Sequence, residues 1–346
     1  MSTEAAKPPP HANVSIESVL DVQQHNFWQR IFGAQSFWVT VALLIICLVM
    51  SWLQPASFAT TENFFNITRN FSFIGIMALG MTAVIATGGI DLSVGSIMGL
   101  TAVASGLTLV AGYPAWAAVL VGLAAGGVTG LINGLIIAYA DISPFVTTLG
   151  MLAIARSVAV VLSGNRMLYH FGPGGPGFKA LGSGAIYIGA IELSYPLLFL
   201  IVLTAAFAII YKMTGWGRHV LAIGGNEHAA LLTGVPVNRI KVQVYVVSGL
   251  AASFAAILDV GWTGSAINAL GVTYELLAIS AAVIGGANLM GGEASAYGAF
   301  IGAALIFVIR NSLLMAGVDS NWQGTFVGLF LIIAVYLGKI RGAKRD

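Results

Sequence analysis

The stretch Ala86-Thr-Gly-Gly-Ile-Asp-Leu-Ser-Val-Gly-Ser-Ile-Met-Gly99 is a glycine-rich break, with one acidic residue, between two long apolar runs. A looser copy lies near the C-terminus, where Gly285–Gly292 aligns with Gly88–Gly95 and places Asn288 opposite Asp91. The repeat predicts two pseudo-symmetric halves, each with a broken or re-entrant helix. Because glycine tolerates tightly turned backbone and short polar side chains can satisfy exposed amides, we expect Asp91 and Ser93 to act as a hinge or cap.

The composition of the chain predicts its class. Of the 346 residues, 58% are hydrophobic, only 8% are charged and 43 are glycine, which is typical of an integral membrane protein and not of a soluble domain. We therefore predict an all-α, polytopic bundle of transmembrane helices. The formal charge of +2 gives no indication of nucleic-acid binding. Cys47 is the only cysteine, so no disulfide framework or cysteine-based metal site is expected.

About ten apolar stretches have the roughly 20 residues that a transmembrane helix needs. They cover residues 36–54, 71–88, 93–111, 115–138, 144–163, 193–211, 242–264, 273–289, 294–315 and 321–339. Most Lys and Arg residues outside the spans fall on one side, which predicts that both termini are cytoplasmic. The predicted organisation is a cytoplasmic tail (1–35) with a candidate interfacial helix (14–32), a membrane domain (36–340) and a basic tail (341–346).

Two loops are long. The outer loop, residues 164–192, contains Gly172-Pro-Gly-Gly-Pro-Gly177, which matches the spacing of a dinucleotide-binding loop. We do not expect a phosphate site there, because such a site needs a preceding strand and a following helix with free amides, and the two prolines remove donors.

The inner loop, residues 212–241, is expected to contain a short helix over residues 227–233. Asn226 is a suitable N-cap, and Gly234 is suited to end the helix. Basic residues flank it. Two interpretations stay open at this point: a surface helix on anionic lipid headgroups, or a docking helix for a cytosolic partner.

Several motifs, in order along the chain, resemble those of one family. They are Gly88-Gly-Ile-Asp-Leu-Ser-Val-Gly-Ser96, Leu131-Ile-Asn-Gly134, Pro144-Phe-Val-Thr-Thr-Leu-Gly150 with Ile154-Ala-Arg156, Ala222-Ile-Gly-Gly-Asn-Glu227 and Val283-Ile-Gly-Gly286. The family comprises the membrane permease subunits of bacterial ABC importers for ribose and other monosaccharides, and the resemblance spans about residues 36–340. It implies a type II-like permease of the inner membrane that moves a monosaccharide or polyol by alternating access.

The resemblance also implies partners. These are separate cytosolic ATPase subunits, a periplasmic sugar-binding protein and a second permease copy or a paralogue. The sequence has no Gly-x-x-x-x-Gly-Lys-Ser/Thr motif, so we expect no enzyme activity and no cofactor on this chain, with ATP and Mg on the partners. An ion-coupled secondary transporter, which would share the repeat and the broken helices, is the alternative.

The resemblance favours the docking interpretation of the inner loop. Ala229, Ala230 and Gly234 match the coupling-helix pattern Glu-Ala-Ala-x-x-x-Gly of ABC importers, with His228 at the usual acidic position and Glu227 one place earlier. The residues assigned to ATPase coupling are Asn226, Glu227, His228, Ala229, Ala230 and Gly234.

Polar residues inside the spans are candidates for the transport path, because an ionisable group at this depth is costly unless it faces a partner or a cavity. A neutral sugar is bound by hydrogen-bonding groups and aromatic faces, so a tether between helices suits Arg156 and Arg310 better. Candidates for the substrate path or hinge are Gly88, Gly89, Asp91, Ser93, Asn133, Trp262, Tyr274, Glu275 and Asn288. Asp259 and Leu277 depart from the family's pattern and bear on substrate choice or on nothing.

Glycines recur at every fourth position. Gly122, Gly126, Gly130 and Gly134 form one such stripe, and Gly298 and Gly302 form another. A stripe of small residues lets neighbouring backbones approach closely, so we predict tight helix packing at both.

Overall fold

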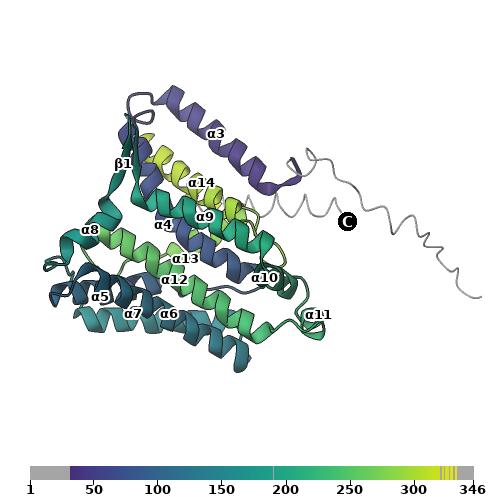
Figure 1. The fold of residues 1–346 in the computed structure, drawn as a ribbon. Coiled ribbons are helices and arrows are strands. Elements are labelled where there is room, and N and C mark those ends of the chain that lie inside the picture. The colour runs from purple at the N-terminus through teal and green to yellow at the C-terminus, as the bar shows by residue number, and fades with distance from the viewer. Residues whose placement is uncertain are drawn as a thin grey trace, which may run out of the picture.

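The computed structural model describes residues 32–189 and 191–319 and, beyond them, residues 322, 324–326, 328, 329 and 332. This part of the chain is a helical bundle with one small antiparallel sheet (Figure 1). In chain order the elements are α3 (Gln35–Leu53), α4 (Thr61–Ala86), α5 (Val94–Val110), α6 (Ala115–Tyr139), α7 (Pro144–Ser163), α8 (Gly175–Ser183), β1 (Ala185–Ile188), β2 (Ile191–Ser194), α9 (Tyr195–Met213), α10 (Gly215–Gly225), α11 (Glu227–Leu232), α12 (Val237–Thr263), α13 (Tyr274–Ile284) and α14 (Ala296–Met315).

Among the described residues, seven helices are long and apolar enough to cross a membrane: α3, α4, α6, α7, α9, α12 and α14. The apolar helices α5 and α13 are shorter, with 17 and 11 residues. At 1.5 Å per residue, α13 is about 16 Å long, roughly half of the hydrocarbon thickness. The chain is therefore a polytopic helical protein, but the ten predicted spans are not all full-length. Apart from residues 32–35, the predicted N-terminal tail and the interfacial helix lie outside the described residues, and so do the C-terminal tail and most of the last span (321–339).

Helix α4 begins ten residues before the predicted span. Thr60 caps it, because its side chain accepts a hydrogen bond from Asn63 N at 3.1 Å. The first turns carry polar residues that hydropathy excludes from a span, and most of them are buried or half-buried against neighbouring helices. Hydropathy alone set the predicted boundary too late.

The predicted outer loop also contains regular structure. Helix α8 begins at Gly175 with Pro176 in its first turn, where a missing N–H costs nothing. Strands β1 and β2 pair antiparallel, with Ala185 opposite Ser194 and Ile188 opposite Ile191. The outer loop therefore contains a helix and a hairpin, and Pro176 lies in the first turn of that helix. No described strand precedes α8 directly, as a dinucleotide fold would require.

Helix α12 is the centre of the bundle, with contacts to α4, α5, α6 and α8 (Figure 1). The closest packing is against α6, along the first glycine stripe. A Cβ at Gly126 would collide with Ser253 and the Gly249 carbonyl, and one at Gly130 would lie 3.0 Å from Val246 Cα. The second stripe packs in the same way, since Gly298 and Gly302 on α14 lie against the backbone at the end of α13. The predicted close packing is confirmed.

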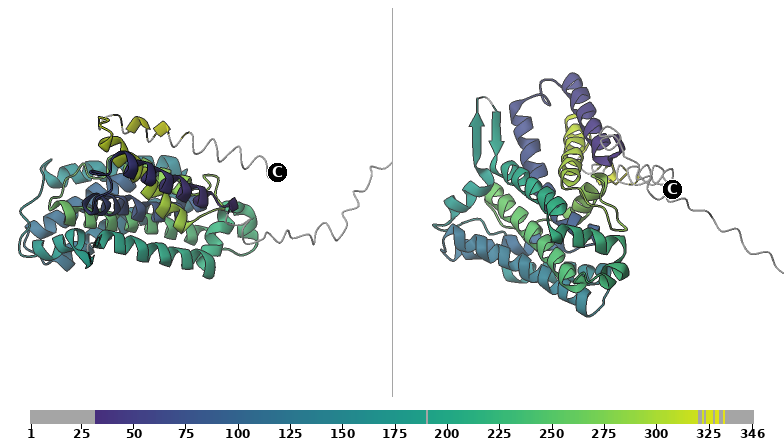
Figure 2. Two further views of the ribbon diagram at one scale, coloured as in Figure 1. Left: turned by 90° about the horizontal axis from the view of Figure 1, so that it is seen from above. Right: turned by 45° about the vertical axis from the view of Figure 1, so that its right-hand side comes forward.

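The short elements that connect the long helices gather at opposite ends of the bundle. Figure 1 places α8 and the β1–β2 hairpin at one end and α10 with α11 at the other, and Figure 2 shows the hairpin projecting beside α4. These are called the hairpin end and the α11 end below.

We expect Gly130→Ala to destabilise the folded protein by about 1–3 kcal/mol, because the added methyl group pushes α12 away from α6. Gly150→Ala on α7 is the control, since a Cβ there meets nothing within 4 Å. Thermal unfolding of the detergent-purified variants measures the difference. Equal melting temperatures for the two variants would contradict the packing argument.

Candidate functional site

The two glycine-rich breaks lie against each other near the α11 end. The backbone N–H of Gly292 donates a hydrogen bond to the carbonyl of Ala86 at 3.0 Å. Gly224, near the end of α10, fits into this junction, because a Cβ there would collide with the Ala86 carbonyl and with Gly292 N. Gly88 turns the chain after α4 with a φ of 77°, a value that favours glycine. The two segments that align in the sequence are thus in contact in the folded chain.

Asp91 is fully buried beside the first break. Its Oδ1 accepts hydrogen bonds from Ser93 N at 3.0 Å and Ser93 Oγ at 2.6 Å, and its Oδ2 accepts one from Ser248 Oγ of α12 at 2.8 Å. Asn133 of α6 donates from Nδ2 to Ser93 Oγ at 2.9 Å. The carboxylate therefore satisfies the turn and links it to two helices. These contacts suit a hinge or cap, whose role in transport stays a prediction.

Asn288 makes the corresponding bond in the second break. Its Oδ1 accepts from Met290 N at 3.0 Å, the same two-residue spacing as the bond from Ser93 N to Asp91. The likeness is confined to this turn, because Asn288 is exposed whereas Asp91 is buried.

Arg156 of α7 ties three segments together. Its guanidinium donates to the carbonyls of Asn268 and Leu270, the latter at 2.9 Å, and to the Gly95 carbonyl of α5 at 3.1 Å. Glu275, at the start of α13, lies close to Gly95 and interacts electrostatically with Arg156. This geometry fits the tether predicted for Arg156 and places Glu275 beside it.

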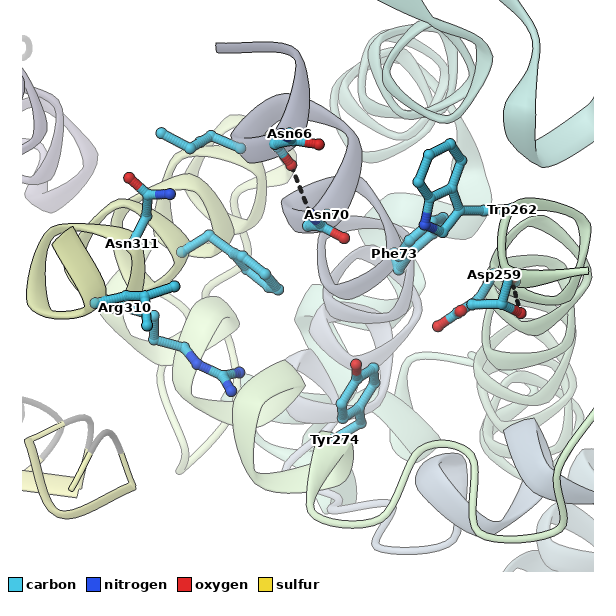
Figure 3. A pocket seen from close by; sticks show the side chains of 12 residues that line it. Asn66, Asn70, Phe73, Asp259, Trp262, Tyr274, Arg310 and Asn311 are labelled. Atoms are coloured by element: carbon cyan, nitrogen blue, oxygen red, sulfur yellow. Dashed lines mark hydrogen bonds between the residues drawn. The ribbon is translucent and has the colours of Figure 1, made fainter. Parts of the chain in front are cut away.

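A cavity of about 320 Å³ opens between α4, α12, α13 and α14. It lies toward the hairpin end, since it uses the C-terminal ends of α12 and α14. Its lining combines aromatic rings with amide and charged groups: Asn66, Ile67, Asn70, Phe73, Asp259, Trp262, Thr263, Tyr274, Phe307, Arg310, Asn311 and Leu314. Figure 3 shows Asp259 and Trp262 on one side, Arg310 and Asn311 on the other, and Asn70 and Tyr274 between them. We call it the outer pocket.

The outer pocket brings together only some of the predicted residues. Trp262 and Tyr274 both line it, and so does Arg310, which the sequence favoured as a tether. Asn133 and Asn288 belong to the two breaks instead. The volume is at the lower end of the range for small-molecule sites, about 300–1,000 Å³.

Sequence reasoning missed three amides of the pocket. Asn66, Asn70 and Asn311 were not singled out, although Asn63, Asn66 and Asn70 recur at helical spacing on α4. That polar stripe was a usable signal. It went unnoticed because hydropathy placed these residues outside the span.

At the opposite end, α11 forms as the sequence predicted. Asn226 Oδ1 accepts from Ala229 N at 2.9 Å and caps the helix, while Gly234, with a φ of 86°, ends it. Glu227 forms an ion pair with Lys241 of α12 at 2.7 Å. His228 is exposed and Ala230 is buried. The tip presents Leu231 and Leu232, which are 58% and 75% exposed.

Comparison with known proteins agrees with this architecture. Residues 63–335 match the family described as "Branched-chain amino acid transport system / permease component". The chain is 38% identical to a probable ABC transporter permease protein of Sinorhizobium fredii over 88% of this chain and 89% of the relative. It is 34% identical to the galactose/methyl galactoside import permease protein of Escherichia coli (89% and 95%) and 36% identical to the ribose import permease protein of the same species (85% and 91%). No solved structure matches significantly.

The fold and these matches define a membrane permease subunit of an ABC transport system. The chain belongs to the family of permease components of branched-chain amino acid type transport systems, whose members include sugar import permeases. It is a transporter subunit without an ATPase site of its own, and not an enzyme.

We expect Asp91→Asn to impair transport more than assembly. The amide oxygen can still accept from Ser93, and the amide nitrogen can donate to Ser248 Oγ, but hydrogen bonds to a neutral group are weaker by about 1 kcal/mol. Uptake per assembled complex in proteoliposomes measures the effect, with Asp141→Asn, the same substitution at an exposed residue outside both breaks, as the control. Full uptake by Asp91→Asn would make Asp91 an ordinary interhelical contact.

Proposed function

We propose that this permease subunit carries a monosaccharide or related polyol across the bacterial inner membrane, and that the outer pocket binds it during transport. The observation that carries the proposal is the lining of the pocket, where three carboxamides stand among aromatic rings. Amides donate to and accept from hydroxyl groups, and an aromatic face suits the apolar face of a sugar ring. The names of the galactose and ribose import relatives support the same substrate class.

The family description supplies a second candidate, a branched-chain amino acid. Such a substrate needs an anionic and a cationic group for its two charges, and the pocket contains Asp259 and Arg310. Asp259, however, already faces the buried cation Arg69 electrostatically, so its charge is compensated and less available to a substrate ammonium group. The lining favours the sugar.

The proposed orientation places the α11 end in the cytoplasm and the hairpin end in the periplasm. Lys212, Arg218, Arg239 and Lys241 gather at the α11 end, which agrees with the positive-inside tendency. Both termini would then be cytoplasmic. The periplasmic sugar-binding protein would deliver substrate at the hairpin end, and a second permease copy or a paralogue would complete a type II-like importer.

Energy would come from separate ATPase subunits, which bind ATP and Mg and dock on α11. The residues that would couple the ATPase to the permease are Asn226, Glu227, His228, Ala229, Ala230 and Gly234. Helix α12 can transmit the movement. It is 27 residues long, about 40 Å at 1.5 Å per residue. Its start is bound to α11 through Lys241, its middle to Asp91 through Ser248, and its end lines the pocket with Trp262. A displacement of α11 would thus reach both the break and the pocket, as alternating access needs.

Reconstitution tests the transport function. Proteoliposomes with the permease, its ATPase subunits and the binding protein should take up D-ribose or D-galactose only with ATP, and Trp262→Ala or Asn70→Ala should lower uptake about tenfold, since one lost aromatic or hydrogen-bonding contact is worth roughly 1–2 kcal/mol. Phe64→Ala, exposed on α4 outside the pocket, is the control. Uptake without ATPase subunits would favour an ion-coupled secondary transporter, and uptake of leucine alone would favour the amino-acid substrate.

Docking is tested separately. We expect Gly234→Asp, or deletion of residues 227–233, to abolish co-purification of the ATPase while the protein still inserts, because a side chain is strained at a φ of 86° and displaces the end of α11. Gly215→Asp is the control, since an acid at the first turn of α10 is favourable and meets nothing within 4 Å. Unchanged co-purification of the Gly234 and deletion variants would refute the docking role.

A further inference from the structure

Arg69 is a buried cation directly behind the outer pocket. It does not line the pocket and is only 4% exposed. Three pocket residues nevertheless depend on it: it hydrogen-bonds Asn66, covers Trp262 and interacts electrostatically with Asp259. Glu192 of the β2 strand is the second carboxylate within electrostatic reach. A buried cation is costly unless it is paired and hydrogen-bonded, and these contacts compensate Arg69.

The guanidinium holds the Trp262 ring from one side. Its Cζ lies 3.2 Å from the centroid of the indole and 4.9 Å from that of Phe65. One face of Trp262 is therefore occupied by the cation, while the side chain remains 39% exposed and lines the pocket. A planar guanidinium can stack on a ring in this way, and an ammonium cannot.

The same guanidinium fixes the orientation of the Asn66 amide. Arg69 Nη2 lies 2.7 Å from Asn66 Oδ1, and because arginine can only donate, the amide oxygen must face it. The amide nitrogen of Asn66 is then left to the pocket as a donor. Asp259 supplies the opposite polarity, since a carboxylate only accepts.

We infer that Arg69 is a positioning residue that sets the sugar affinity of the outer pocket, by fixing the Trp262 ring and by presenting Asn66 as a hydrogen-bond donor. The inference rests on the proposed function of the pocket. Its chemical content is specific: the bound sugar offers one hydroxyl oxygen to Asn66 and one hydroxyl hydrogen to Asp259, and stacks on the free side of Trp262.

The test uses the permease–ATPase complex in nanodiscs, titrated with D-ribose and with D-galactose. The change in tryptophan fluorescence that is absent from Trp262→Phe reports binding at the pocket. We expect Arg69→Met to raise the half-saturating sugar concentration about tenfold, within the range of a cation–π contact, and to make Trp262 more accessible to acrylamide. Arg166→Met, an exposed cation at the hairpin end, is the control.

Two further variants keep the test decisive if Arg69→Met folds poorly. Asn66→Asp preserves the contact with Arg69 but removes the donor, so it should fold normally and still lose sugar affinity. Arg69→Lys keeps the charge but cannot stack and hydrogen-bond at once, so it should not restore binding. Wild-type affinity in Asn66→Asp, or full rescue by lysine, would overturn the inference.

The outcomes also separate this inference from the proposed function. If Trp262→Ala and Asn70→Ala retain wild-type binding of radiolabelled sugar, a readout that does not need the Trp262 signal, the pocket itself is wrongly assigned and both proposals fall. If those two variants lose affinity while Arg69→Met and Asn66→Asp do not, only the role of Arg69 falls.

Discussion

The structure depends on satisfying the backbone groups that its two broken helices expose, and the hydrogen bond between the Gly292 amide and the Ala86 carbonyl does this where the breaks meet. A helix that breaks within a membrane protein exposes backbone groups that lipid cannot satisfy. Here the two breaks satisfy each other, and a short polar side chain closes each turn, Asp91 in one and Asn288 in the other. Because Gly224 lets α10 approach the same junction, the segment that leads to α11 contacts both breaks.

Helix α12 connects that junction to both ends of the bundle. Its packing on α6 is close enough that backbone lies against backbone along a glycine stripe, so the two helices can move only together or by sliding. The helix also makes polar contacts at three levels, with Glu227, with Asp91 and within the outer pocket. Under the proposed function, α12 would connect the docking helix α11 at one end to the outer pocket at the other, and so couple ATP-driven movement to substrate access.

The sequence predicted the kinds of side chain in the candidate site, but it did not identify all of the residues that line it. Trp262 and Tyr274 were expected near substrate because a sugar favours aromatic faces, and both line the pocket. The amides of α4 were missed because their polarity made the segment look like a loop, although tertiary contacts bury most of it. Arg310, which was expected to act as a tether because a charge suits a neutral sugar poorly, lies in the pocket wall, and its role as a tether stays a prediction. In each case the side chain's neighbours come from other helices, which spacing along one helix does not reveal.

By itself the sequence determined the class of protein, the positions of most helices, the glycine packing faces, both breaks and the capped helix α11, because hydropathy, small-residue period and capping are local properties. Only the tertiary structure decided that α13 is a half-length helix, that the two breaks touch, and that α4, α12, α13 and α14 enclose a cavity. These features depend on which faces of distant segments meet, and that choice is made by packing and by the need to satisfy buried polar groups across the whole bundle.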